Sequence, residues 1–327
     1  ATNEEYNTLK GQLLFFRGFF HFQLMQYWGG MPYVDKVLST SELELERLNC
    51  HDMADRIADD LKEAARLLPI NWDNTEVGKL TFNKNQLRIT KAAAWGYLGK
   101  AYLFAGSPLA NFESTGSKSF NAEYCKKAAD AFAELLKAVD NGETWIKLVD
   151  FSDYSNLFYS CGRNGALAGY PEAILQAPLY DGWFNGCPWG PASAFQENSI
   201  GAGFVSPNAR YVENYGMANG LPITDDDSGY DPEDPWTGRD PRFYHDIVID
   251  GDAILKGYES DPRHYAELFN GGRSKRNDGA GRTGYLLRKL IPIDANEVDS
   301  NWGGFLQLSY MRLADVYLMY AEAVLKG

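Results

Sequence analysis

The sequence is short of positive charge, and it has no apolar run long enough for a membrane span. Only 31 lysines and arginines stand against 44 acidic residues, so the 327-residue chain has a formal net charge of −13 at pH 7. Such a surface repels phosphate backbones and anionic lipids, so we expect no nucleic-acid partner. The most apolar stretch, residues 13–28, contains Arg17 and His21 and is too short and too polar in its middle to cross a bilayer.

The spacings of common metal sites and enzymes are missing as well. The four cysteines form no CxxC or Cys/His set, and the four histidines are isolated. Cys50 and Cys125 fall in predicted helices and are expected to be small buried side chains, whereas a pairing of Cys161 with Cys187 stays open. There is no GxSxG of a serine hydrolase. The acidic stretch 225–240 leaves room for a glycosidase carboxylate pair but sets no separation between two carboxylates, so we expect no enzyme.

Two motifs match by letter but not by context. Residues 279–284 (GAGRTG) fit the GxGxxG of dinucleotide sites, yet a polar stretch precedes them and a strand-like one follows, which favours a turn. Asp225, Asp227 and Asp231 resemble part of an EF-hand loop, but Trp236 stands where the bidentate glutamate belongs. We therefore expect no cofactor, with a loop-bound Ca²⁺ as the one metal hypothesis left open.

Leucine and aromatic residues dominate the first helix, predicted over residues 5–28. Eleven of the sixteen residues in LLFFRGFFHFQLMQYW (13–28) are Leu, Phe, Met, Tyr or Trp. A helix that is apolar on nearly every side belongs inside a larger assembly, so this one is predicted to be the buried core helix. Gly29 and Gly30, followed by Pro32, end it.

Apolar periodicity and capping residues predict four further long helices. Asn49 is a plausible N-cap for the first of them and Thr90 for the second, and Pro69 ends the first. The stretches 70–88 and 106–121 are expected to be loops. The predicted helices span residues 50–67, 91–106, 122–139 and 309–325.

The second and third of these helices carry a tetratricopeptide signature in two halves. One half, W-x2-L-G-x2-Y, is met by Trp95, Leu98, Gly99 and Tyr102, and the other, A-x3-F, by Ala128 and Phe132. About 17 extra residues separate the halves relative to a standard repeat. The pattern predicts a mostly α fold, a tetratricopeptide-like superhelix of paired helices with an inserted loop-rich subdomain.

The middle of the chain has a different character. Gly, Pro, Asn, Asp and aromatic residues dominate it, with short helices expected near 151–159 and 206–215 and short strands near 172–178, 246–250 and 284–290. A loop region this long is expected to carry the function. The predicted organisation is a helical scaffold over 1–140, a ligand-binding subdomain over 141–307, and a returning scaffold helix over 308–327 whose partner helix would lie beyond Gly327.

Several aromatic residues of this middle part sit among Gly, Asn, Pro and Asp, where no helix or strand core is evident. For any one of them, packing of the loop onto the helices is the competing interpretation. Sugar rings present C–H faces that pack on aromatic faces, while amide and carboxylate groups bond the hydroxyls. The predicted ligand-binding residues are Trp183, Phe184, Asn185, Trp189, Trp236 and Trp302, with residues 183–190 the densest group.

Five passages together produce a family resemblance. They span residues 13–34, 88–106, 219–251, 284–291 and 310–323, and include WGGMP at 28–32, RDPRF at 239–243 and RLAD at 312–315. Their order and spacing resemble those of the SusD/RagB family, nutrient-binding outer-membrane lipoproteins. By this resemblance the motifs are mainly structural, and the ligand-binding loops vary with the ligand.

The resemblance implies a non-catalytic protein that binds glycans at the extracellular face of the outer membrane. It also implies a SusC-like TonB-dependent transporter as partner and an N-terminal lipid anchor. By the same resemblance, the anchor, the family's first N-terminal helix (which precedes the helix at 5–28) and the closing C-terminal part would be absent here. A peptide ligand, as in some family members, stays open. A tetratricopeptide-type protein-interaction scaffold and a glycoside hydrolase are two further hypotheses. The identity of a glycan, its linkage and length, and the oligomeric state do not follow from the sequence.

Overall fold

A computed structural model describes residues 2–159, 171–177, 206–254, 260, 264–275, 283–289 and 309–327. The chain divides into two units, of which unit 1 comprises residues 1–148, 171–176 and 309–327 and unit 2 comprises 149–170 and 177–308. Residues 141–148 and 171–176 thus group with the helical part, whereas the sequence-based division assigns them to the loop-rich part.

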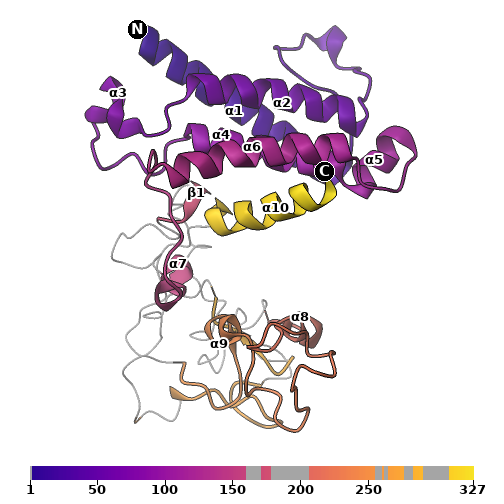
Figure 1. Cartoon of the computed structure of the whole chain (residues 1–327), viewed down its shortest axis with the longest axis vertical. Helices are drawn as coiled ribbons and strands as arrows, with labels where there is room; N and C mark the ends of the chain where they lie inside the picture. The colour runs from indigo at the N-terminus through magenta and orange to yellow at the C-terminus, as the bar shows by residue number, and fades with distance from the viewer. Residues whose placement is uncertain are drawn as a thin grey trace. The chain divides into compact units, whose positions relative to one another are not determined.

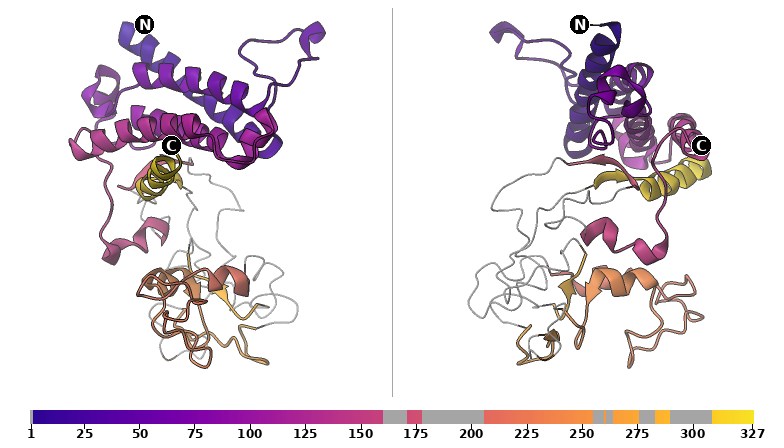
Figure 2. Two further views of the ribbon diagram at one scale, coloured as in Figure 1. Left: turned by 45° about the vertical axis from the view of Figure 1, so that its right-hand side comes forward. Right: turned by 90° about the vertical axis from the view of Figure 1, so that its left-hand side faces the viewer.

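Long helices lie side by side in unit 1 (Figure 1; Figure 2). The predicted N-caps Asn49 and Thr90 accept hydrogen bonds from Asp52 N and Ala93 N and so begin their helices. The long helices are α1 (Asn3–Trp28), α2 (Cys50–Leu67), α4 (Lys91–Gly106), α6 (Ala122–Asp140) and α10 (Leu313–Lys326). Each of them packs on the next in this order, which confirms the predicted tetratricopeptide-like architecture.

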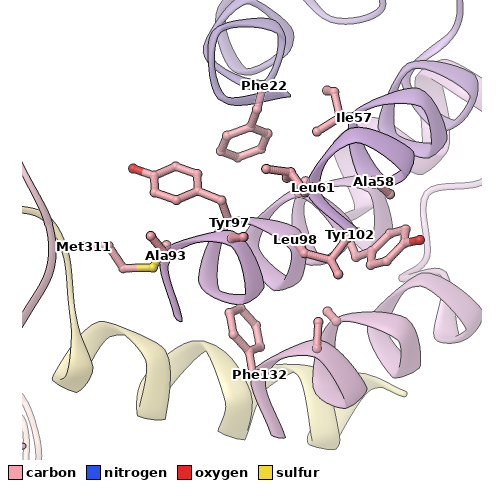
Figure 3. Packing of buried hydrophobic residues seen from close by; sticks show 14 of the residues in the cluster. Phe22, Ile57, Ala58, Leu61, Ala93, Tyr97, Leu98, Tyr102, Phe132 and Met311 are labelled. Atoms are coloured by element: carbon pink, nitrogen blue, oxygen red, sulfur yellow. The ribbon is translucent and has the colours of Figure 1, made fainter. Parts of the chain in front are cut away.

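The centre of this stack is α4, which lies between α2 and α6 (Figure 3). Its two inner glycines permit unusually close approach. A Cβ added to Gly99 would lie 2.5 Å from Cε1 of Phe132, and one added to Gly96 would lie 2.5 Å from Sδ of Met311. Real Cβ atoms are not found this close, so a methyl group at Gly99 would require the Phe132 ring to shift, and one at Gly96 would require the flexible Met311 side chain to move. The two halves of the tetratricopeptide signature therefore meet where Phe132 packs on Gly99.

The prediction that residues 13–28 are buried on nearly every side is wrong. Phe15 and Phe22 are fully buried, but Leu13 is 64% exposed and Phe20 is 59% exposed. Within the residues that the structure describes, α1 packs on α2 and α4, and Leu13 and Phe20 do not take part in the buried core of these helices. The helix that is buried on nearly every side is α4.

The stretch 106–121, expected to be a loop, contains the helix α5 (Pro108–Thr115). Ser107 caps this helix, and Pro108 occupies its first turn. The Glu113 carboxylate of α5 accepts a hydrogen bond of 2.6 Å from Cys50 N, and Ser114 Oγ accepts one of 3.0 Å from His51 N. The extra residues between the two halves of the repeat thus supply acceptors for the N-terminus of α2, where backbone donors would otherwise lack partners.

Shorter elements interrupt the other connections of unit 1. The predicted loop 70–88 contains a 3₁₀ turn and one short helix, and the connection between α1 and α2 contains a second 3₁₀ turn. Their bounds are Trp72–Asn74 (η2), Glu76–Lys79 (α3) and Thr40–Glu42 (η1).

The predicted helix over 309–325 starts later than expected, because residues 309–312 form a strand. This strand, β4 (Ser309–Arg312), pairs antiparallel with β1 (Ala173–Gln176), which falls within the predicted strand 172–178. Arg312 Nη1 donates to Glu172 Oε2 at 2.8 Å, and the Glu172 side chain is almost fully buried. The two-stranded sheet and this ion pair join the points at which the chain leaves unit 1 and returns to it.

Unit 2 contains short elements around a small core of Val212, Phe243 and Ile247. A 3₁₀ turn and three short helices are described, and β2 pairs antiparallel with β3. The predicted short helices near 151–159 and 206–215 and the strands near 246–250 and 284–290 are present in shorter form. The elements are η3 (Phe151–Asp153), α7 (Asn156–Tyr159), α8 (Ala209–Glu213), α9 (Pro241–Asp246), β2 (Ile247–Val248) and β3 (Leu286–Leu287).

Cys50 and Cys125 are buried and free, which confirms the expectation of small buried side chains. Burial raises the pKa of the Cys50 thiol to about 12, and it raises the pKa of Cys125 as well. Both thiols therefore stay protonated and unreactive at neutral pH. Cys161 and Cys187 lie outside the described residues.

We predict that Gly99→Ala destabilises the protein, although glycine-to-alanine changes normally favour a helix by about 1 kcal/mol. The added methyl group would meet the Phe132 ring, and overpacking of this kind costs about 1–3 kcal/mol. We expect a net loss of about 1–2 kcal/mol in the free energy of unfolding, measured by urea denaturation with circular dichroism.

The double variant Gly99→Ala, Phe132→Leu tests the cause. A smaller, movable side chain at 132 makes room for the methyl group, so the two changes together should cost less than their sum. Additive costs, or a stabilised Gly99→Ala protein, would contradict a close approach at this position.

Candidate functional site: the aromatic cluster around α9

The segment RDPRF at 239–243 organises unit 2 through a buried arginine. The Arg239 guanidinium donates to the backbone carbonyl groups of Val212 at 2.9 Å, Tyr215 at 2.6 Å and Pro235 at 2.9 Å. Its planar group also lies over the Phe243 ring, at 4.8 Å from the ring centroid. One side chain thus fixes three loop positions, because a guanidinium can donate in several directions within one plane.

The next residues of this segment start α9. Asp240 accepts a hydrogen bond of 2.9 Å from Arg242 N, and Pro241 occupies the first turn, where its missing N–H is no loss. The Arg242 guanidinium pairs with the Asp240 carboxylate and lowers its pKa below the usual range. The family resemblance implies that this motif is mainly structural. In the structure Arg239 fixes the loops, and Asp240 and Pro241 begin α9.

Trp236 is the one predicted ligand-binding residue within the described part of the chain. Its ring lies parallel to that of Phe243, with centroids 6.1 Å apart and an angle of 10°, and the Tyr285 ring meets it edge-on at 5.5 Å. Trp236 is half-buried in this arrangement. The residue therefore packs on the small core of unit 2, and a role in ligand binding remains a prediction.

The other predicted site residues lie outside the described residues. Trp183, Phe184, Asn185 and Trp189 fall within 178–205, and Trp302 falls within 290–308. The ligand-binding role predicted for them stays a prediction.

A second group of side chains surrounds the buried carboxylate of Asp246, the last residue of α9. Asp246 Oδ2 accepts hydrogen bonds from Tyr215 Oη at 2.8 Å, Tyr154 Oη at 3.1 Å and Lys289 Nζ at 3.1 Å. Burial is the main cause that raises the pKa of Tyr215 far above its usual value, so its hydroxyl stays protonated and donates. Lys289 also lies 4.2 Å from the centroid of the Phe158 ring. This one carboxylate thus joins three residues from three other segments of the chain.

Exposed aromatic rings border this polar group. Phe151 is 47% exposed and lies parallel to Tyr154, with centroids 5.4 Å apart, and it meets His245 edge-on at 5.2 Å. Tyr211, which is 46% exposed, meets Tyr215 edge-on at 5.8 Å. Rings that keep an exposed surface beside phenol and imidazole groups can bind a sugar or another ring by stacking and hydrogen bonding.

The exposed rings of this group are not among the predicted ligand-binding residues. Those residues are aromatic side chains among Gly, Asn, Pro and Asp, whereas Phe151 and Tyr154 belong to a 3₁₀ turn and its end, and Tyr211 belongs to α8. The only signal was their spacing of three or four residues within short helical stretches, at 151 and 154 and at 211 and 215.

The acidic loop tested for Ca²⁺ uses its carboxylates within its own turns. Asp225 Oδ1 accepts from Asp227 N at 2.9 Å, and Asp231 Oδ1 accepts from Glu233 N at 2.9 Å. Throughout the described ranges, no group of three or more His, Cys, Asp or Glu side chains is arranged to hold a metal ion.

Two family models match the chain in succession. Residues 1–103 match a model described as starch-binding associating with outer membrane, and residues 181–326 match the SusD family model. Together they cover most of the sequence. The chain belongs to the SusD/RagB family. No curated protein matches it in sequence.

Solved structures of SusD-like proteins share the fold. A SusD-like protein from Bacteroides fragilis is 21% identical with a TM-score of 0.73, and 99% of this chain covers 59% of that one. A laminarin-binding SusD-like protein is 20% identical (TM-score 0.53; 99% and 61% covered), and a protein solved with a xylogluco-oligosaccharide is 17% identical (TM-score 0.60; 100% and 56% covered). The chain spans about three fifths of the length of these proteins.

None of the helices in the described part of the chain has the length and apolar character that a membrane span requires.

We predict that Arg239→Lys destabilises unit 2 by about 2–4 kcal/mol, because an ammonium group cannot replace several buried, charge-assisted hydrogen bonds at once. Arg242→Lys is the matched control. Its exposed ion pair with Asp240 should change stability by only about 0.5 kcal/mol.

Hydrogen exchange followed by mass spectrometry on peptides from 206–254 and 91–106 measures both variants. Arg239→Lys should speed exchange in 206–254 and leave 91–106 unchanged. Equal effects of the two lysine variants would contradict the organising role of Arg239.

Proposed function

We propose that this chain is a non-catalytic glycan-binding protein of the bacterial cell surface. Membership of the SusD/RagB family is the observation that supports this most, since one matching family model is described as starch-binding associating with outer membrane. Two structures that share its fold support the same class of ligand, one of a laminarin-binding protein and one solved with a xylogluco-oligosaccharide. We assign glycan binding without catalysis to this site.

Unit 2 is the proposed place of binding. Its exposed ring Phe151 lies beside Tyr154 and His245, and its exposed ring Tyr211 lies beside Tyr215, so aromatic faces and polar groups that could act on a sugar are close together at each place. The predicted loop around Trp183 and the exposed rings would form parts of the same binding unit. A net charge of −13 favours a neutral glycan over an anionic one.

Delivery to a SusC-like TonB-dependent transporter is the second part of the proposal. A lipid anchor in the full-length protein would hold this chain at the extracellular face of the outer membrane, and the transporter would take up the bound glycan. Family membership supports this arrangement. Co-purification of the full-length protein with a transporter from membranes of its source would test it directly.

We predict binding of a soluble polysaccharide with a dissociation constant in the micromolar to millimolar range, because a few stacking contacts give modest affinity. Isothermal titration with starch, laminarin and xyloglucan measures it. Trp183→Ala and Trp189→Ala should each weaken binding about tenfold or more, since loss of a central aromatic side chain costs about 2 kcal/mol. Phe151→Ala and Tyr211→Ala test the α9 cluster in the same way.

Leu109→Ala is the matched control, because Leu109 is an exposed apolar residue of α5 in unit 1 and should not affect binding. Unchanged affinity in all four aromatic variants would contradict recognition by these rings. Binding of peptides with no affinity for any glycan would favour a peptide-binding protein, and release of reducing sugar by the purified protein would show a hydrolase.

A further inference from the structure

A buried histidine of α1 holds the segment that follows this helix. The His21 side chain is buried, and its ring lies nearly parallel to that of Tyr33, with centroids 4.0 Å apart. Its Nδ1 lies 2.8 Å from the backbone carbonyl oxygen of Arg17, and its Nε2 accepts a hydrogen bond of 3.0 Å from Val34 N. A carbonyl oxygen can only accept and a backbone N–H can only donate, so Nδ1 carries the proton and Nε2 does not. These two hydrogen bonds therefore assign His21 as a neutral ring with its proton on Nδ1.

The charged groups around this ring do not offer a partner for a second proton. Arg17 lies one turn before His21 on α1, and its guanidinium donates two hydrogen bonds of 2.6 Å to the Asp60 carboxylate of α2. Tyr33 donates to the same carboxylate, and burial raises the pKa of Tyr33 far above its usual value, so this phenol stays uncharged. Both carboxylate oxygens are thus already bound, and the ion pair of Arg17 with Asp60 has no net charge.

The segment held in this way starts the connection between α1 and α2. The carbonyl oxygen of Asp35 accepts a hydrogen bond of 3.1 Å from Arg17 Nη1. At the other end of the connection, Arg47 donates to backbone carbonyl groups at and just after the end of α1, at 2.6 and 2.9 Å. Residues 36–46 lie between these two fixed ends. Among these contacts, the hydrogen bond from Val34 N ends on a histidine, the side chain that titrates closest to neutral pH.

A second proton on His21 would remove the acceptor of Val34 N. Nε2–H and the Val34 N–H would then face each other as two donors, and one of them would lose its hydrogen bond. We propose that His21 is a pH-sensitive latch, which holds residues 33–35 against α1 when it is neutral and releases them when it is protonated. The closed segment resists the second proton, whereas an opened segment exposes the ring to water, where histidine binds a proton near pH 6.5. Opening should therefore increase as the pH falls below about 6.5.

Native-state hydrogen exchange at pH 7.5 and pH 5.5 tests the latch, with each rate divided by that of the unprotected peptide at the same pH. Protection of residues 33–35 should fall by up to about tenfold at the lower pH, since one pH unit below 6.5 can change the opening constant by at most a factor of ten. Amides of α4 should keep their protection. The latch lies in unit 1, so the test does not depend on the proposed glycan site.

Two histidine variants separate the latch from a general effect of pH. His21→Phe keeps an aromatic ring but has no acceptor for Val34 N, so residues 33–35 should be opened to the same extent at both pH values. His51→Phe is the matched control, because His51 donates from Nε2 to the Ala105 carbonyl oxygen at 3.1 Å, and a proton added at Nδ1 leaves that bond intact. This variant should respond to pH as the unchanged protein does.

The nitrogen chemical shifts of the His21 ring at pH 7.5 test the starting state, since a protonated and an unprotonated ring nitrogen give well-separated signals. We expect a protonated Nδ1 and an unprotonated Nε2, and loss of both signals in His21→Phe identifies them. A proton on Nε2 at pH 7.5, equal protection of residues 33–35 at both pH values, or an unchanged pH response in His21→Phe would each overturn the proposal.

Discussion

The close approach of α4 to its neighbours is the constraint on which unit 1 depends. Gly99 lies against the Phe132 ring and Gly96 against the Met311 side chain, so a larger residue at either position would force its neighbour to move. The buried surfaces of α2 and α6 both pack on α4, so a displaced α4 would open both interfaces at once. Gly99 and Phe132 of the tetratricopeptide signature therefore determine how closely α4 and α6 approach each other.

That signature is also what made the helical architecture predictable. Trp95, Leu98, Gly99 and Tyr102, with Ala128 and Phe132, specify a helix pair from six positions, and the caps Asn49 and Thr90 begin their helices as expected. Burial was harder to predict. An apolar helix such as α1 has the composition of a core helix whether its outer face meets another helix or solvent, and composition does not tell which. The helix α5 was missed because its polar sequence resembles a loop until Glu113 is seen to cap α2.

In unit 2 the sequence predicted the short helices and strands better than it predicted which aromatic residues are exposed. The RDPRF segment was recognised as structural, and Arg239 explains why, since its partners are backbone carbonyl groups of distant loops that leave no pattern in the side chains. Trp236 was selected as a loop aromatic, whereas it packs on Phe243. Phe151 and Tyr211 were missed because exposure is a property of the folded chain.

The helix α4, and not the more apolar α1, is the core of the helical unit described here. Native-state hydrogen exchange measures this directly. We predict that amides of α4, from Tyr97 to Tyr102, exchange most slowly and only through global unfolding of the unit, and that amides of α1 exchange faster. Amides of α1 that exchange as slowly as those of α4, or more slowly, would contradict the account.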